Sequence, residues 1–183
     1  MAEEVEVIKY NLLLRAAVIF AFMGGEVMAA DIVNINITGR VLAAPCVVDA
    51  GSVSQNVDFG QLIATDLRAA GSSSEWKPFK VTLVNCPVST VAAIATFTGT
   101  PFATDATLYS NATSPTDASN VAIQVVDDSN RSIVKGNGTS MTTSINPASH
   151  QAVFALAGRV ISPNGNAGSG RINSVVMMTF TYQ

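Results

Sequence analysis

Ionisable and redox-active side chains are scarce in this sequence. Only 13% of its 183 residues are charged, and it has one histidine and two cysteines; an average globular domain carries about 25% charged residues. The net charge of −3, with no cluster of Lys or Arg, argues against binding to nucleic acid. These few histidines and cysteines could supply little of a metal site, a cofactor site or a nucleophile–base pair. The composition therefore gives little support to an enzymatic function.

Apolar and small polar residues make up most of the chain, and 48% are hydrophobic. No segment has sustained helical periodicity, whereas short β-forming runs recur between Gly, Pro, Asn, Asp and Ser. This spacing predicts a single all-β domain, a sandwich or a barrel. Strands are expected at 33–41, 56–62, 76–85, 91–99, 121–126, 131–135, 151–161 and 173–183, with a loop over 100–120 that holds a short strand at 106–109.

The first 29 residues have the features of a secretory signal peptide. The stretch 11–30 combines positive charge, an apolar core and small residues before the expected cleavage site, which follows Ala29 or, as the second choice, Ala30. A membrane anchor would need about 20 apolar residues. Arg15 and Glu26 interrupt this run, so an exported protein is the better interpretation.

The two cysteines, Cys46 and Cys86, both lie in the exported part. An oxidising compartment favours their pairing in one structural disulfide, which contributes about 4 kcal/mol for a loop of this order. Two free thiols or a redox pair are the alternatives. The spacing does not resemble Cys-x-x-Cys, and a second pair of zinc ligands is lacking.

The segment that follows the expected cleavage site alternates strictly. Its apolar row is Val33, Ile35, Ile37, Gly39 and Val41. A period of two predicts a half-buried strand, yet a free chain end is usually disordered unless something holds it. The strand therefore pairs either within its own domain or with another molecule, and the periodicity alone does not distinguish the two.

Residues that could carry chemistry are better explained as structure. Asp127 and Asp128 lie in an expected turn, where Asp is favoured for local hydrogen bonds. His150 is a single imidazole without a triad, so we expect a polar surface residue. Trp76 and Tyr109 are isolated aromatics, for which packing is the default.

Two further patterns are read as incidental. The glycines within 162–170 lack the order of a phosphate-binding loop and predict a flexible connection. Glycosylation sequons in an Asn- and Thr-rich chain arise by chance, and they begin at Asn36, Asn111, Asn130 and Asn137.

An ordered set of short motifs resembles the type 1 fimbrial subunits of the chaperone–usher pathway and spans essentially all of residues 30–183. The two cysteines are part of it, and the short arm and the Leu-x-Asn-Cys-Pro segment are most similar to small tip-fibrillum adaptor subunits. The motifs are Ala30-Asp31, an alternating arm ending in Gly39, Val41-Leu42-Ala43-Ala44-Pro45-Cys46, Val57-Asp58-Phe59-Gly60, Leu83-Val84-Asn85-Cys86-Pro87, Ala95-Thr96-Phe97-Thr98-Gly99, Val125-Val126-Asp127-Asp128 and Tyr182.

The resemblance implies an incomplete immunoglobulin-like β-sandwich that lacks its last strand. Residues 1–29 would be the signal peptide, 30–41 an N-terminal donor-strand arm and 42–183 the pilin domain. The arm would present Val33, Ile35, Ile37, Gly39 and Val41 to a neighbouring subunit. The edge of the groove that receives such a strand, or binds a chaperone, would be Val176, Met178, Phe180, Tyr182 and Gln183.

The implied partners are a periplasmic chaperone, an outer-membrane usher and neighbouring fimbrial subunits. The chain would be exported through the periplasm to a fimbrium at the cell surface, without catalytic residues, a metal or a cofactor. The alternative is a self-complete secreted β-sandwich that acts as an adhesin or lectin.

Overall fold

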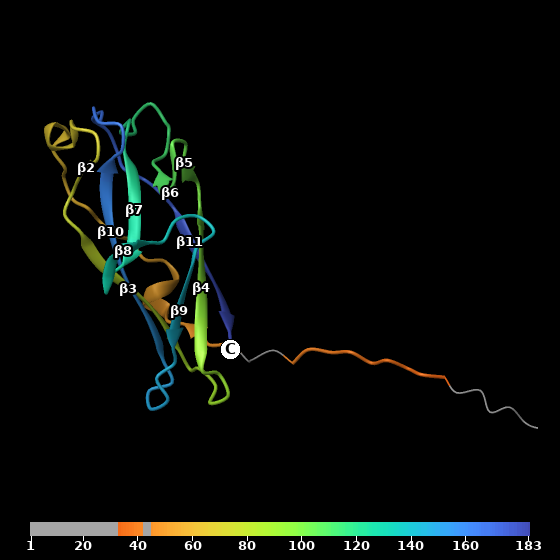
Figure 1. The fold of residues 1–183 in the computed structure, drawn as a ribbon. Coiled ribbons are helices and arrows are strands. Elements are labelled where there is room, and N and C mark those ends of the chain that lie inside the picture. Colours follow the sequence, from red (N-terminus) through yellow and green to blue (C-terminus); the bar gives the residue numbers. More distant parts are fainter. Residues whose placement is uncertain (1–32, 42–44) are drawn as a thin grey trace, which may run out of the picture. The chain divides into compact units, whose positions relative to one another are not determined.

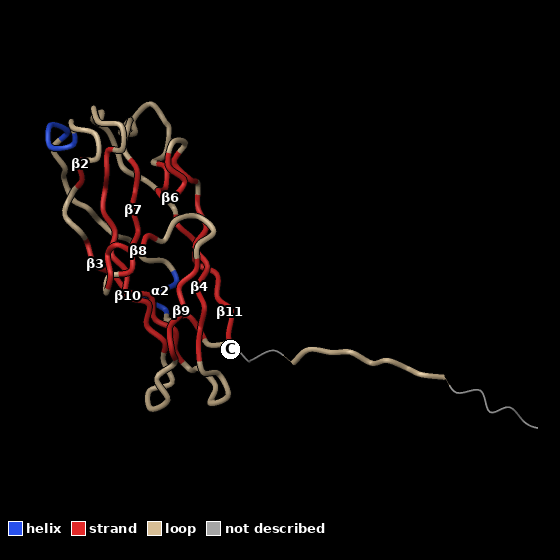
Figure 2. Tube along the Cα trace, in the orientation of Figure 1, coloured by secondary structure: helices blue, strands red, loops and turns tan. Residues whose placement is uncertain are grey.

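Two sheets of antiparallel strands form the domain. The structure, a computed structural model, describes residues 33–41 and 45–183. The predicted signal peptide therefore lies outside the described residues. Residues up to Gly39 and the domain from Arg40 onward form separate units. Within the described residues, no helix is long and apolar enough to cross a membrane. Figure 2 shows that the domain is built of strands, with only short helical turns.

The larger sheet carries the strand order β1-β3-β10-β7-β6-β5, and Figure 1 shows β3, β10 and β7 side by side. Strand β2 pairs with β10, and β8 pairs with β7. The bounds of these strands are β1 Val47–Val48, β2 Ser72–Ser73, β3 Lys77–Val84, β5 Pro101–Phe102, β6 Asp105–Ser110, β7 Ala122–Asp127, β8 Asn130–Val134 and β10 Ala152–Ser162.

The smaller sheet has the order β11-β4-β9, with β4 (Ala92–Gly99) between β11 (Val176–Tyr182) and β9 (Ser140–Ser144). Two short helices, α2 (Ala50–Val53) and η2 (Ala64–Leu67), lie in the connections.

The core lies between the inner faces of the two sheets. Alternate residues of β3, β4 and β10 point into it, as the period of two predicts. On β10, Phe154 and Leu156 are fully buried, and on β4 Phe97 is 1% exposed. The predicted inward face of β3 is confirmed, since Leu83 and Val81 are buried and Phe79 packs partly buried against them.

A glycine marks the point where the chain passes from the small sheet to the large one. A Cβ atom on Gly99 would lie 2.7 Å from Cδ1 of Tyr109 and 2.9 Å from the carbonyl oxygen of Val175. Tyr109 is fully buried, and its hydroxyl donates a hydrogen bond of 2.9 Å to the carbonyl of Lys135. Burial raises the pKa of Tyr109 to about 12. The packing role expected for Tyr109 is therefore confirmed.

The expectations differ from the structure chiefly in three places. Residues 33–41 form no strand and all are exposed. Residues 56–62 also form no strand, because Phe59 is held through its side chain, near Gly158 and Phe79, while its backbone joins no ladder. Strand β9 was not expected, since its Ser- and Thr-rich sequence has only Met141 as an apolar residue.

Candidate functional site: the open edge of the small sheet

Strand β11 is hydrogen-bonded on one side only. It pairs with β4 over its whole length, with Phe180 opposite Ala95 and Tyr182 opposite Ala93. Within the described part of the chain, no strand pairs with its other side. An edge of this kind presents unpaired N–H and C=O groups to any strand that approaches. We call the unpaired side of β11, with its inward row Val176, Met178, Phe180 and Tyr182, the open edge.

The inward side chains of the open edge are large, apolar and incompletely covered. All four are half-buried, while the residues opposite them on β4 include Ala93 and Ala95, both fully buried. The difference holds for large side chains too, since Phe97 of β4 lies opposite Met178 and is only 1% exposed. What separates the two strands is that β4 has a strand on each side and β11 has one. A further strand beside β11 would cover this row.

An aromatic pair links the open edge to the larger sheet. The rings of Phe180 and Phe154 lie 5.6 Å apart between centroids, with a tilt of 46°. Tilted contacts of this kind add about 0.5–1.5 kcal/mol beyond area burial. Phe154 is fully buried and Phe180 only half-buried. The pair therefore connects the buried core to the partly exposed inward row of β11.

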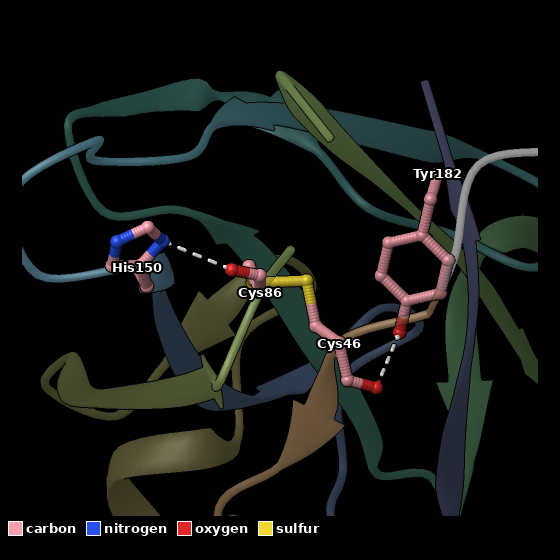
Figure 3. The surroundings of a disulfide bond; sticks show 4 residues. All are labelled: Cys46, Cys86, His150 and Tyr182. Carbon is pink, nitrogen blue, oxygen red and sulfur yellow. Dashed lines mark hydrogen bonds between the residues drawn. A yellow bond between two sulfur atoms is a disulfide. The ribbon is translucent and has the colours of Figure 1, made fainter. Parts of the chain in front are cut away.

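The disulfide lies at the carboxyl end of β11, as Figure 3 shows. The predicted bond between Cys46 and Cys86 is confirmed, and both residues are buried. The hydroxyl of Tyr182 donates a hydrogen bond of 3.4 Å to the carbonyl oxygen of Cys46. Burial raises the pKa of Tyr182, and this hydrogen bond partly opposes the shift. The disulfide thus holds in place the Cys46 carbonyl to which Tyr182, at the end of the open edge, is hydrogen-bonded.

His150 belongs to the same region, where it is partly exposed and has a specific partner that the expectation of a polar surface residue did not include. Its Nδ1 donates a hydrogen bond of 3.1 Å to the carbonyl of Cys86 (Figure 3), and the amide of Cys86 donates to the carbonyl of His150 at 3.0 Å. A backbone φ of 54° places the residue in the left-handed region. The imidazole therefore holds a tight turn against the disulfide.

Gln183 continues the pairing with β4. Its carbonyl oxygen accepts from the amides of Val91 at 2.6 Å and Ala92 at 3.2 Å, and its own amide donates to Ala92 at 3.0 Å. These three bonds fix the end of β11 beside the loop that follows Cys86.

Asn111 holds the other end of β11. Its amide nitrogen donates to the carbonyls of Ala118 at 2.9 Å and Arg171 at 3.0 Å, and its oxygen accepts from the amide of Asn173 at 2.7 Å. The residue is 7% exposed. A buried side chain that satisfies three backbone groups is structural, so the interpretation of its sequon as incidental fits this geometry.

The predicted donor residues carry no pairing of their own. Val33 and Ile35 are each 79% exposed, Ile37 is 88% exposed and Val41 is 99% exposed. A Cβ atom on Gly39 would meet nothing within 4 Å. A row of β-branched residues left in solvent is costly. The apolar row is thus available for burial by another molecule.

Trp76 is engaged with two arginines. The guanidinium carbon of Arg159 lies 4.4 Å from the ring centroid and that of Arg131 lies 5.8 Å from it. Arg159 also donates to Gln124 at 2.7 Å and to Ser73 at 2.9 Å, and desolvation lowers its pKa. The ring covers a partly buried cation on the outer face of the larger sheet, in agreement with the packing role expected for it.

Known proteins agree with the fold. The fimbrial protein family matches residues 35–183. Protein FimG of Escherichia coli K12 is 34% identical over 166 residues, which are 91% of this chain and 93% of FimG. The S-fimbrial adhesin protein SfaS of an uropathogenic E. coli strain is 37% identical over 150 residues, or 81% of this chain and 84% of SfaS.

Among solved structures, the P pilus rod subunit PapA superposes with a TM-score of 0.61 at 22% identity, covering 76% of this chain and all of PapA. A subunit of a chaperone–usher pilus gives a TM-score of 0.60 at 21% identity, over 87% of this chain and all of that one. Both likenesses concern the fold.

The chain belongs to the fimbrial protein family. It is a structural, non-enzymatic fimbrial subunit. As a fimbrial subunit it is part of a surface fimbria.

Proposed function

We propose that this subunit joins the fimbria by donor-strand exchange, with residues 30–41 as the donor arm and the open edge of residues 42–183 as the acceptor. The observation that carries the proposal is the half-buried inward row of β11 beside the fully buried row of β4. A strand added along β11 gains main-chain hydrogen bonds, and its alternate side chains enter the uncovered core.

The arm has the composition that such a strand needs. Its aliphatic residues Val33, Ile35, Ile37 and Val41 alternate and are exposed, and burying them contributes about 6–12 kcal/mol before the cost of ordering the arm. Gly39 interrupts the row with a residue that fits a shallow position. The arm of one subunit thus carries apolar side chains that the open edge of another lacks.

Before assembly, an open edge requires protection from aggregation. A periplasmic chaperone supplies a strand to β11 during export, and the outer-membrane usher is the place where the arm of the next subunit replaces it. Residues 1–29 direct this export and are removed. Basic groups of the chaperone bind Gln183, which lies at the end of the acceptor strand.

The position of the subunit in the fibre is proposed from its relatives. Sequence identity of 34% to FimG across nearly the full length supports a minor tip adaptor subunit. In this role the chain joins two different neighbours, one through its arm and one through its open edge.

The donor function is tested by Ile37→Asp. A carboxylate buried in the neighbour's core is strongly unfavourable, so we expect the variant to bind chaperone normally and to lose exchange into a neighbouring subunit by at least roughly 100-fold. Exchange is measured as the rate at which the variant displaces chaperone from a chaperone-bound neighbour.

Asn36→Asp is the matched control, because it adds the same charge on the opposite face of the arm, where we expect less than a roughly threefold change in rate. Normal exchange by Ile37→Asp would refute the assignment of the donor row. A purified subunit that is stable alone, and whose β11 accepts no added arm peptide, would refute the acceptor.

A further inference from the structure

Exposed valines gather at the end of the domain from which the arm departs. Val47 is 55% exposed, Val88 is 87% exposed and Val91 is 67% exposed. The disulfide and the end of β11 place their backbones in one region of the domain. Val47 follows Cys46, Val88 lies two residues after Cys86 in the disulfide, and the amide of Val91 bonds to Gln183. We call these three residues the valine collar.

The collar has no charged residue in its own sequence. Residues 45–48 read PCVV and residues 86–92 read CPVSTVA. Single exposed apolar residues are ordinary on a protein surface. Three of them in the region around the disulfide leave apolar area that a protein partner covers better than water does.

The length of the chain decides which partner reaches this surface. Residues 42–44 alone separate Val41, the last apolar residue of the arm, from Pro45 in the domain. At about 3.8 Å for each Cα–Cα step, Val41 lies within roughly 15 Å of Pro45 in any conformation. A subunit that takes up Val41 in its core must therefore bring its own body close to the collar.

We propose that the valine collar is a second contact surface, and that its occupant is the neighbouring fimbrial subunit that has accepted this chain's arm. The inference rests on the donor-strand function proposed above. It adds that side chains of the domain, outside the arm, also contact the neighbour. The whole subunit therefore dissociates from its neighbour more slowly than an isolated arm does.

The expected counterpart on the neighbour is also apolar. Every strand pair in the described sheets is antiparallel. An arm added antiparallel to an acceptor strand places Val41 beside the start of that strand. In this chain, Val175 directly before β11 is 69% exposed and Met177 near its start is 60% exposed, and related neighbours with such residues would offer an apolar surface to the collar.

The test uses the full chain in assembled fimbriae. A photo-crosslinking amino acid is placed at Val88, at Ile37 in the arm or at Val53, which is 71% exposed on α2. The inference expects positions 88 and 37 to crosslink to one and the same fimbrial subunit, and position 53 to give at least tenfold less product. Crosslinking at 37 without any at 88, or to a different subunit from 88, overturns it.

A second measurement tests whether the contact stabilises the fibre. The doubly substituted Val88→Ser, Val91→Ser chain is expected to leave isolated fimbriae about tenfold faster than wild type, and Val53→Ser within twofold of it. Equal rates for all three chains overturn the inference while leaving donor-strand exchange intact. If position 37 captures no subunit, the proposed function fails instead, so the two failures are distinguishable.

Discussion

The two edges of the small sheet, β9 and β11, are built in opposite ways. β9 is mostly Ser and Thr, and the hydroxyl of Thr143 donates to the carbonyl of Val153 on β10 at 3.3 Å. β11 instead turns four large apolar side chains inward and leaves them half-buried. A polar edge tied to the other sheet resists pairing with another molecule, whereas an apolar edge with free backbone groups promotes it. The sheet thus directs association to one side.

Truncating the aromatic pair tests this comparison with the largest expected effect. Phe154→Ala removes a fully buried ring and is expected to destabilise the free subunit by about 3–5 kcal/mol. Phe180→Ala removes a half-buried ring, so we expect roughly half that loss in the free subunit. With arm peptide bound, the two losses should converge. Denaturant unfolding with and without the peptide measures both.

A Phe180→Ala loss that is unchanged by the peptide would contradict the view that the open edge is completed by an added strand. Thr142→Ala, on the exposed face of β9, serves as the control and should change neither value.

Removing the disulfide is the next largest perturbation. Cys46→Ser with Cys86→Ser should lower the free energy of unfolding by about 2–5 kcal/mol. It should also weaken arm binding, because Cys46 receives the hydrogen bond from Tyr182 at the end of the open edge. Among the described residues, no hydrogen bond joins β9 to either cysteine, so protection of the β9 amides from hydrogen exchange should fall only with global stability. Equal local loss at β9 and β11 would contradict this.

The smallest expected effect is on the titration of Tyr182. Its pKa is raised by burial, so the neutral phenol favours the folded state, and this stabilisation is present below the unfolded pKa of about 10. It is lost as the pH rises through the higher folded value. An arm strand that covers the open edge should raise the pKa further, which a tyrosine-specific spectroscopic titration measures. Tyr109, already fully buried, should not respond to the peptide.

Strong alternation is the reason that much of this fold could be predicted. Strands β3, β4, β10 and β11 carry apolar residues at every second position, and each was expected close to its observed bounds. Residues 56–62 imitate that pattern but are held only by partly buried side chains, Phe59 and Leu62, that pack against the core. β9 lacks the pattern, because its place depends on hydrogen bonds to β4 rather than on an apolar face.

The open edge was predictable as a strand, but its incomplete burial was not. Periodicity identifies which side of β11 faces inward, while the number of strands beside it depends on the rest of the sheet. The anchoring roles of Asn111 and His150 gave no signal either. Both depend on backbone groups from distant segments, such as Asn173 and Cys86, that only the folded chain brings together.

The position of Asn111 has a practical consequence for producing this protein. Oligosaccharyl transfer in a eukaryotic secretory pathway acts on the nascent polypeptide before its domains close, and Asn111 begins a sequon there. A sugar on that amide removes one of the two N–H donors with which the finished domain binds Ala118 and Arg171. Secretion from yeast or mammalian cells should therefore yield protein that misfolds at the loop before β11. Export to a bacterial periplasm avoids this glycosylation.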